Sequence, residues 1–200
     1  MITLYTLKPS GSAHKIRIAL ALLDIPYHEI MLAGGDHKRE PFIALNPLGQ
    51  VPVFVDDDLI LRDSQAILVY LAARYRAGEW DGRDAAERGR IAQWLALAGN
   101  EISNGLAKLR IAALFGATID RAVAETNAAR ALDVLEARLD QRDWLEGERL
   151  TIADIACAPY VALAHQGAIN LDAHPRSQGW VDRLAALPAF PSMAGWEAIA

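Results

Sequence analysis

The spacing of apolar residues along the chain changes near residue 77. Before that point, short apolar runs of strand length alternate with stretches in which apolar side chains recur every three or four residues. The expected strands are residues 2–6, 27–31, 53–55 and 59–61, and the expected helices are residues 12–23, 38–45 and 64–75. A βαβ half joined to a ββα half predicts a small mixed sheet that carries helices.

The second part of the chain has a helical pattern throughout. Apolar residues recur at helical spacing over 91–109 and 123–139, and two further helices are expected to begin near Thr151 and Pro175. Thr151 and Asp154 have the spacing of a capping box, in which each side chain accepts a hydrogen bond from the backbone of the other residue. These stretches predict four or five packed helices.

Between the two patterns, residues 78–84 contain two glycines and several charged side chains, which is typical of a linker. The sequence therefore predicts an α/β N-terminal domain over residues 1–77, the linker over 78–84, and an all-α C-terminal domain over 85–200.

Composition and charge narrow the possible partners. The chain has 200 residues, is 52% hydrophobic and carries a formal net charge of −5, so we expect it to bind neither nucleic acid nor an acidic membrane surface. No apolar run approaches the roughly 18 residues needed to span a bilayer, and Met1 leads directly into an expected strand. We therefore expect a cytoplasmic protein.

Cysteine and histidine contribute little reactive chemistry of their own. The single cysteine, Cys157, allows no internal disulfide, and its apolar neighbours favour a buried, inert side chain. The five histidines lack metal-ligand spacing, so no metal site is expected, and His14 and His37 are expected to be solvated. Any thiol chemistry must then use a thiol from another molecule.

Ser10 and Ser12 lie where the first expected strand gives way to the first expected helix. Free backbone N–H groups and the positive end of the helix dipole meet at such a turn. Both hydroxyls can cap the helix, and a hydroxyl that accepts a backbone hydrogen bond can still donate its own proton to an anion. A thiolate is one anion that this arrangement suits.

Two further positions combine a structural and a functional interpretation. Val51-Pro52 precedes a strand, where the bond is most simply trans, but a cis bond would present the Val51 backbone to an extended peptide ligand. Asp63 and Ser64 open a helix and can cap it. They can equally bind the ammonium and carboxylate groups of an α-amino acid.

Four motifs in this order and at these separations make the chain resemble bacterial-type cytosolic glutathione S-transferases over nearly its whole length. The motifs are residues 9–20, 46–52, 63–67 and 150–155. The resemblance implies a thioredoxin-like N-terminal domain, an all-helical C-terminal domain, a cis bond before Pro52, and a homodimer. It also implies glutathione as co-substrate, with no metal.

The same resemblance implies roles for individual residues. The cysteinyl backbone of glutathione is expected to pair with Val51, while its γ-glutamyl head meets Asp63 and Ser64. Asp63 stands where Glu or Gln is common, and its side chain is one methylene shorter than Glu. Gln50 and His37 occupy positions that often reach the glycyl carboxylate.

The thiol-activating group differs between classes of the family. Ser10 aligns with a serine of zeta-like members and with a threonine of nu-like disulfide reductases. Ser12 aligns with an asparagine of the nu-like members and with a cysteine of beta-like members. Ser10 is placed ahead of Ser12 as the hydroxyl that touches the sulfur.

The implied activity is conjugation of glutathione to an apolar electrophile held between the domains, against side chains such as Asn104, Lys108 or Ile111. Glutathione-dependent disulfide reduction is an alternative. Zeta-like isomerisation of a cis-dienoic acid is another, although those members usually carry Ser-Ser-Cys where this chain has Ser10-Gly11-Ser12. A non-catalytic interaction protein of the same fold is the alternative from a different class.

Overall fold

A four-stranded mixed sheet organises the first part of the structure, a computed structural model that describes residues 1–199. Its strands follow the order β2-β1-β3-β4. β1 pairs with β2 in parallel, and the other two pairs are antiparallel. The strands are β1 (Ile2–Thr6), β2 (His28–Met31), β3 (Val53–Asp56) and β4 (Leu59–Leu61). This arrangement confirms the predicted α/β fold class.

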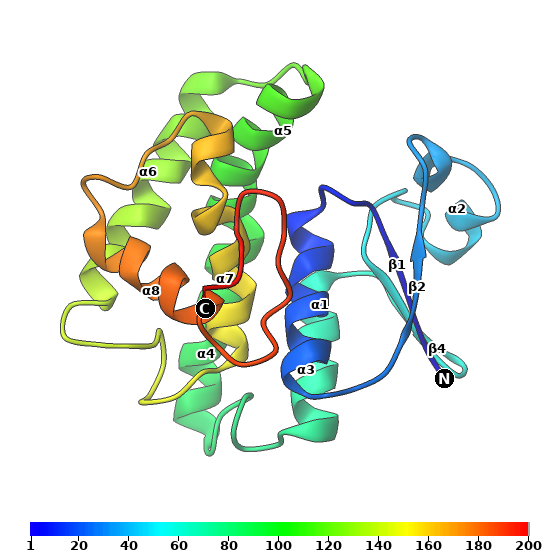
Figure 1. Cartoon of the computed structure of the whole chain (residues 1–200), viewed down its shortest axis with the longest axis horizontal. Coiled ribbons are helices and arrows are strands. Elements are labelled where there is room, and N and C mark those ends of the chain that lie inside the picture. Colours follow the sequence, from blue (N-terminus) through cyan, green and yellow to red (C-terminus); the bar gives the residue numbers. More distant parts are fainter. Residues whose placement is uncertain (200) are drawn as a thin grey trace.

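Two helices cover the face of the sheet that meets the rest of the molecule. α1 (Gly11–Leu22) and α3 (Ser64–Tyr75) pack side by side between the sheet and the C-terminal helices (Figure 1). Their apolar stripes are fully buried with the inward residues of β1 and β3. Because of this packing, the N-terminal ends of both helices lie at the same end of the sheet, where they line one cleft.

The prediction of a single helix over residues 38–45 is wrong. The structure has a 3-10 turn, η1 (Asp36–Lys38), and a separate short helix, α2 (Phe42–Leu45). Pro41 lies between them, and it offers no N–H to continue a helix.

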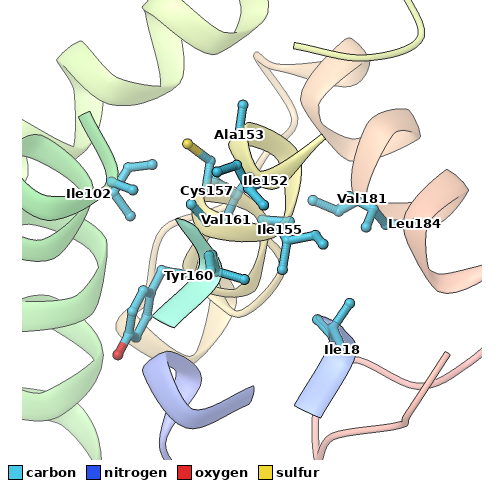
Figure 2. Packing of buried hydrophobic residues seen from close by; sticks show 14 of the residues in the cluster. Ile18, Ile102, Ile152, Ala153, Ile155, Cys157, Tyr160, Val161, Val181 and Leu184 are labelled. Carbon is cyan, nitrogen blue, oxygen red and sulfur yellow. The ribbon is translucent and has the colours of Figure 1, made fainter. Parts of the chain in front are cut away.

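The C-terminal part is helical, as predicted. Its elements are α4 (Ala85–Leu97), a π-helical segment η2 (Ala98–Ala107), α5 (Lys108–Phe115), α6 (Arg121–Arg138), α7 (Ile152–Ala162), a 3-10 turn η3 (Ala164–Gly167) and α8 (Pro175–Ala185). α7 is buried along its whole length down to Val161 and contacts α1, α3, α4, η2 and α8. Figure 2 shows the apolar side chains of α7 packing toward several neighbouring helices. α7 is therefore the centre of the packing.

Asp154 fastens α7 at its first turn. One carboxylate oxygen accepts hydrogen bonds from the Leu145 N–H at 2.9 Å and the Trp180 indole at 3.0 Å. The other accepts from the Thr151 backbone at 2.9 Å, which together with the Thr151 cap confirms the predicted capping box. Burial raises the pKa of Asp154 to about 6, although these donors favour the ionised form.

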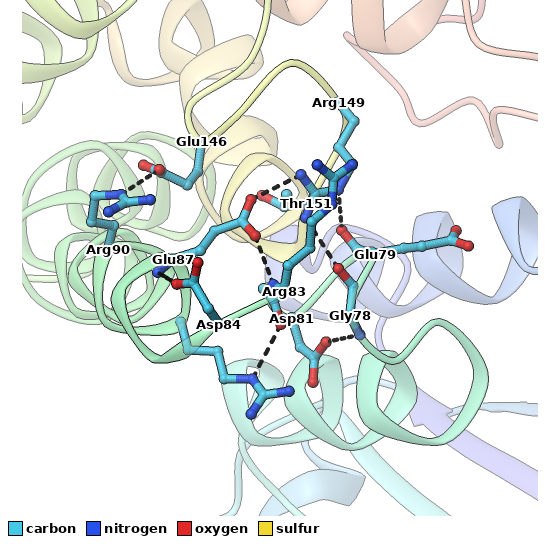
Figure 3. Close-up of polar contacts among 12 residues, drawn as sticks. Gly78, Glu79, Asp81, Arg83, Asp84, Glu87, Arg90, Glu146, Arg149 and Thr151 are labelled. Carbon is cyan, nitrogen blue, oxygen red and sulfur yellow. Dashed lines mark hydrogen bonds and ion pairs between the residues drawn. The ribbon is translucent and has the colours of Figure 1, made fainter.

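Polar contacts hold the predicted linker in place (Figure 3). Arg149 donates to the carbonyl oxygens of Glu79 and Gly78 and forms an ion pair with Glu87 at 2.8 Å. Glu87 also accepts from the Arg83 N–H at 2.6 Å. The linker is therefore anchored to α4 and to the loop before α7, while the division of the chain at residues 78–84 stays a prediction.

The His14 side chain is buried, whereas the sequence predicted that it is solvated. Its side chain is buried beside Phe190 and Trp196 of the C-terminal segment, and burial lowers its pKa to about 3. The expectation was wrong because the C-terminal segment folds back over α1, which the spacing of residues in α1 cannot reveal. Among the described residues, the structure contains no helix long and apolar enough to cross a membrane.

Candidate functional site

A cleft of about 690 Å³ opens where the N-terminal ends of α1 and α3 face η2, α5 and α7. The candidate site residues from the sequence all line it: Ser10, Ser12, His37, Gln50, Val51, Pro52, Asp63 and Ser64. They come from four separate segments of the first domain, so the fold gathers them at one place. Their individual roles stay predictions.

Ser10 is the N-cap of α1. Its hydroxyl oxygen accepts a hydrogen bond from the Ala13 N–H at 3.1 Å, which satisfies one of the free donors at the helix start. The hydroxyl proton has no acceptor within the described chain. Ser10 can therefore cap the helix and donate to an anion in the cleft at the same time.

Ser12 is linked to Tyr160, a residue of α7 that was not among the site residues expected from the sequence. The two hydroxyl oxygens lie 3.0 Å apart, and the Ser12 N–H donates to the Tyr160 hydroxyl at 3.2 Å. Figure 2 shows the Tyr160 ring pointing from α7 past the buried cluster. Either hydroxyl can donate in this pair, so one of the two protons is left for a ligand.

Gly11 is what allows Tyr160 to approach. A Cβ at this position would lie 2.8 Å from Cε1 of the Tyr160 ring, which is too close for two carbon atoms that are not bonded to each other. A glycine between two serines at a strand-to-helix turn was the available signal, since close approach of another group is a common reason for glycine.

Replacement of Gly11 with Ala is expected to displace the Tyr160 ring and break its bond to Ser12. We expect a loss of about 1–3 kcal/mol in the free energy of unfolding, the usual cost of overpacking, and lower activity. Tyr160→Phe is the matched control, because it removes the same hydrogen bond without the clash. Urea unfolding of both variants tests this, and equal stability of Gly11→Ala and wild type would contradict it.

The turn at Val51-Pro52 has the cis bond that the resemblance implied. Asn46 supports the turn by donating to the Gln50 carbonyl at 2.7 Å and accepting from the Leu48 N–H at 3.1 Å. The N–H and C=O of Val51 make no hydrogen bond within residues 1–199. They are available to an extended ligand in the cleft, as an unpaired strand edge would be.

Asp63 and Ser64 begin α3 at the opposite wall. One Asp63 oxygen caps the helix through the N–H groups of Gln65 and Ala66, at 2.9 and 3.0 Å. The other oxygen has no protein partner, so the exposed carboxylate can still attract a cation. The buried Ser64 hydroxyl lies 2.6 Å from the side-chain amide of Gln65. Capping and ligand binding are compatible here.

His37 is half-buried rather than solvated. Its Nδ1 is buried without a partner, and burial lowers its pKa, as does the neighbouring Lys38. A neutral imidazole at the cleft can donate or accept one hydrogen bond.

Cys157 takes no part in the cleft. It is fully buried, it donates to the Trp94 carbonyl, and burial raises its pKa. The described residues also contain no group of three His, Cys, Asp or Glu side chains that could hold a metal ion.

Comparison with known proteins places this geometry in a family. A family model described as the glutathione S-transferase N-terminal domain matches residues 4–80, and one for the C-terminal domain matches residues 115–188. The chain belongs to the glutathione S-transferase family. It is 33% identical over 201 residues to glutathione S-transferase GstB of Escherichia coli (strain K12), covering 94% of this chain and 95% of that protein.

Other relatives support the same assignment. Maleylacetoacetate isomerase of Pseudomonas aeruginosa is 31% identical over 94% of this chain and 92% of its own length. The crystal structure of a glutathione S-transferase from Pseudomonas fluorescens matches with a TM-score of 0.87 and 30% identity, covering 96% of this chain and 98% of that one. The chain is thus a member of a transferase family, with a thioredoxin-like sheet domain and a helical domain.

In this glutathione S-transferase, sequence reasoning missed a buried cation at the cleft. Lys15 is only 2% exposed and makes no hydrogen bond or ion pair within residues 1–199; its ammonium lies 5.6 Å from the centre of the Tyr160 ring. Burial lowers its pKa to about 8, and the charge of Asp63 partly opposes this shift. The available signal was a lysine one turn after Ser12, on the same side of the helix as that serine.

On the C-terminal wall of the cleft, the helix residues that face the cleft are only partly the ones expected from the sequence. Lys108 and Ile111 line it, but Asn104 lies outside and donates to Asn100 instead. The expectation assumed regular α-helical turns, whereas the ten-residue π segment η2 has a wider hydrogen-bonding pattern. Ser103 and Ala107 therefore face the cleft in its place.

Arg110 is another residue of the cleft that sequence reasoning missed. It is 4% exposed, and it donates to the Pro9 carbonyl at 2.7 Å and to the Gln166 side chain at 2.6 Å. The contact with Pro9 ties α5 to the loop that carries Ser10. Together with the bond between Tyr160 and Ser12, it holds that loop from the helical side.

Proposed function

We propose that this transferase binds glutathione in the cleft, holds its sulfur as a thiolate with the hydroxyl of Ser10 or Ser12, and transfers it to a second substrate with an apolar body. The observation that carries the proposal is the pair of hydroxyls at the N-terminus of α1, facing the cleft, in a chain whose own thiol at Cys157 is buried.

The cleft offers a partner for each part of the tripeptide. The free oxygen of Asp63 suits the γ-glutamyl ammonium, and the N-terminus of α3 with Ser64 suits the adjacent carboxylate. The unpaired backbone of Val51, followed by Pro52, suits the cysteinyl amide. Gln50 and the neutral His37 suit the glycyl carboxylate, because each can donate a hydrogen bond.

Activation of the thiol follows from electrostatics. A free thiol has a pKa of roughly 8.5, so only a few per cent is thiolate at pH 7. A hydrogen bond to an anion contributes about 1.5–3 kcal/mol and a helix N-terminus about 0.3–1 kcal/mol, which together lower the pKa by about two units. The buried Lys15 ammonium adds to this field.

The transfer itself needs little from the protein beyond position. The thiolate forms a bond from sulfur to an electrophilic carbon, and the leaving group departs with its electron pair, while the thiol proton has already passed to solvent. Ile111 and Phe115 are exposed apolar residues at the cleft, and they support an apolar body for the second substrate.

Ultraviolet titration of the thiolate of bound glutathione tests the proposal. In wild type we expect a thiol pKa about two units below that of free glutathione. Alanine at the serine that touches the sulfur should raise it by about one unit, and alanine at the other serine should change it less. If wild type neither binds glutathione nor lowers the pKa, the proposed function is wrong.

Ser10→Ala also removes a helix cap, which costs about 1 kcal/mol of stability. Asp120→Ala is the matched control, because Asp120 caps α6 in the same way through the Val123 N–H and lies outside the cleft. We expect both variants to lose similar stability, with only the serine variant changing the thiol pKa. If neither serine variant changes it, Tyr160 or a backbone N–H replaces them in the proposal.

The similarity to a maleylacetoacetate isomerase favours glutathione-dependent isomerisation as a second candidate function. In that reaction the thiolate adds to a carbon of a cis double bond and leaves again after rotation, so glutathione is not consumed. Glutathione consumption measured with cis-dienoic acids separates it from conjugation. The homodimer and the cytoplasmic location stay predictions.

A further inference from the structure

The walls of the cleft carry an excess of positive charge, although the net charge of the whole chain is negative. Five cationic side chains line it, against a single carboxylate, that of Asp63, in a protein with a net charge of −5. The five are Lys15, Lys38, Arg62, Lys108 and Arg110. None of them forms an ion pair within residues 1–199. The cleft therefore favours anionic ligands over neutral ones.

Bound glutathione accounts for only part of this charge. Its thiolate form has three anionic groups, two carboxylates and the sulfur, and one ammonium, which Asp63 can match. Three cations belong to the first domain, where the proposed function places glutathione: Lys15, Lys38 and Arg62. Lys108 and Arg110 of α5 are left on the wall that faces the second substrate.

The Arg110 side chain is buried in this wall and held in place by hydrogen bonds, unlike a solvated surface charge. It is 4% exposed, and its Nε and Nη1 atoms are occupied by Gln166 and Pro9. Its Nη2 has no protein acceptor, and no carboxylate compensates the guanidinium. A buried charge is costly unless it is paired, so a fixed guanidinium that lines a cleft and has a free donor suits an anionic ligand.

We propose that the second substrate of this transferase carries a carboxylate that binds to Arg110 and Lys108, next to its apolar electrophilic body. The proposal rests on the proposed function, since it assigns the other half of the same cleft. Ile111 and Phe115 contact the apolar body, and the two cations of α5 contact the anionic end. The enzyme therefore selects amphipathic, acidic electrophiles over neutral ones of the same shape.

A matched pair of electrophiles tests this. 4-Chloro-3,5-dinitrobenzoate and its methyl ester react by the same step: the sulfur bonds to the ring carbon that carries chlorine, and chloride leaves with the bonding electrons. Each kcat/KM is divided by the rate constant of the uncatalysed reaction, which removes the difference in intrinsic reactivity. We expect the corrected value for the acid to exceed that for the ester by about tenfold or more, as a charged hydrogen bond allows.

Variants locate the effect. Lys108 is exposed, so Lys108→Met should fold normally, and we expect it to lower the acid-to-ester ratio several-fold; Arg110→Met should lower it about tenfold. Arg121→Met removes the same charge from an exposed residue of α6 outside the cleft and should leave the ratio unchanged. If Arg110 acts only by holding Pro9, both substrates will slow equally and the ratio will stay at its wild-type value, which contradicts the proposal.

Binding of the two reaction products gives a readout that does not depend on turnover. The glutathione conjugate with the free carboxylate should bind to wild type about tenfold more tightly than its methyl ester, and Lys108→Met should reduce the difference. Equal binding of both conjugates overturns the anionic-substrate proposal and leaves the proposed function intact. Failure of both conjugates and of glutathione to bind overturns the proposed function, and this proposal with it.

Discussion

Replacement of Lys15 with Met is expected to make the protein more stable and the bound thiol less reactive. The ammonium of Lys15 is buried and makes no hydrogen bond or ion pair within residues 1–199, so its burial destabilises the folded chain. Its pKa is about 8 in the folded protein against a usual value of 10.5, which corresponds to on the order of 3 kcal/mol. A methionine side chain of similar length removes this cost.

The pH dependence of that gain has a definite sign. Between pH 8 and 10.5 the unfolded chain keeps the Lys15 proton while the folded chain has lost it, so wild-type stability rises over this range through this group. The advantage of Lys15→Met is therefore full below pH 8 and disappears by about pH 10.5. Urea unfolding at pH 7 and pH 10 measures it.

The same substitution is expected to raise the pKa of bound glutathione. Loss of a unit positive charge from the wall of the cleft disfavours the thiolate, so we expect the pKa of the bound thiol to rise by about one unit. At pH values below both pKa values, the thiolate population then falls about tenfold. Ultraviolet titration of the complex gives this number directly.

Lys38→Met is the control, because it removes an exposed cation from the same cleft. We expect it to change the free energy of unfolding by less than about 0.5 kcal/mol. A Lys15→Met variant that gains stability but keeps the wild-type thiol pKa would show that Lys15 does not act on the sulfur. A variant that loses stability would contradict the assigned burial cost.

Replacement of Asp154 with Ala is expected to cost about 4 kcal/mol of stability. The change removes the acceptor for the N–H groups of Leu145 and Thr151 and for the indole of Trp180, all inside the core. Each buried donor left without a partner costs about 1–3 kcal/mol, and part of the capping box is lost as well. This residue therefore joins α7 to α8 and to the loop before α7.

Asp154→Asn refines the prediction. It keeps the volume of the side chain, but one oxygen becomes an NH₂ group that faces N–H donors, so we expect about half the loss of Asp154→Ala. Unfolding in urea measures both variants. A loss of less than about 1 kcal/mol for Asp154→Ala would mean that water replaces the carboxylate within the core.

Elements whose determinants are local were predictable from the sequence. The strands β1 and β4 and the helix α3 have the expected bounds, because apolar periodicity and capping residues act within a few positions. The capping box at Thr151 and Asp154 is visible for the same reason. The cis bond before Pro52 needed the family resemblance, since spacing alone favours trans.

Features that depend on distant parts of the chain were not predictable. His14 looks solvated until the C-terminal segment covers it, and Lys15 looks like a surface charge until α3 and α7 enclose it. The hydroxyl of Tyr160 reaches Ser12 across 148 positions of sequence. The facing of η2 depends on a π-helical hydrogen-bonding pattern, which no residue in that segment signals.

The close fit of Tyr160 into the space above Gly11 has a consequence for recombination between members of the family. The two residues lie on opposite sides of the junction between the sheet domain and the helices, so an exchange of one domain separates them. A chimera that joins the helices of this chain to a sheet domain with a larger residue at position 11 would bring that residue into collision with the Tyr160 ring. Such an exchange therefore keeps the close packing of α1 against α7 only when position 11 is a glycine.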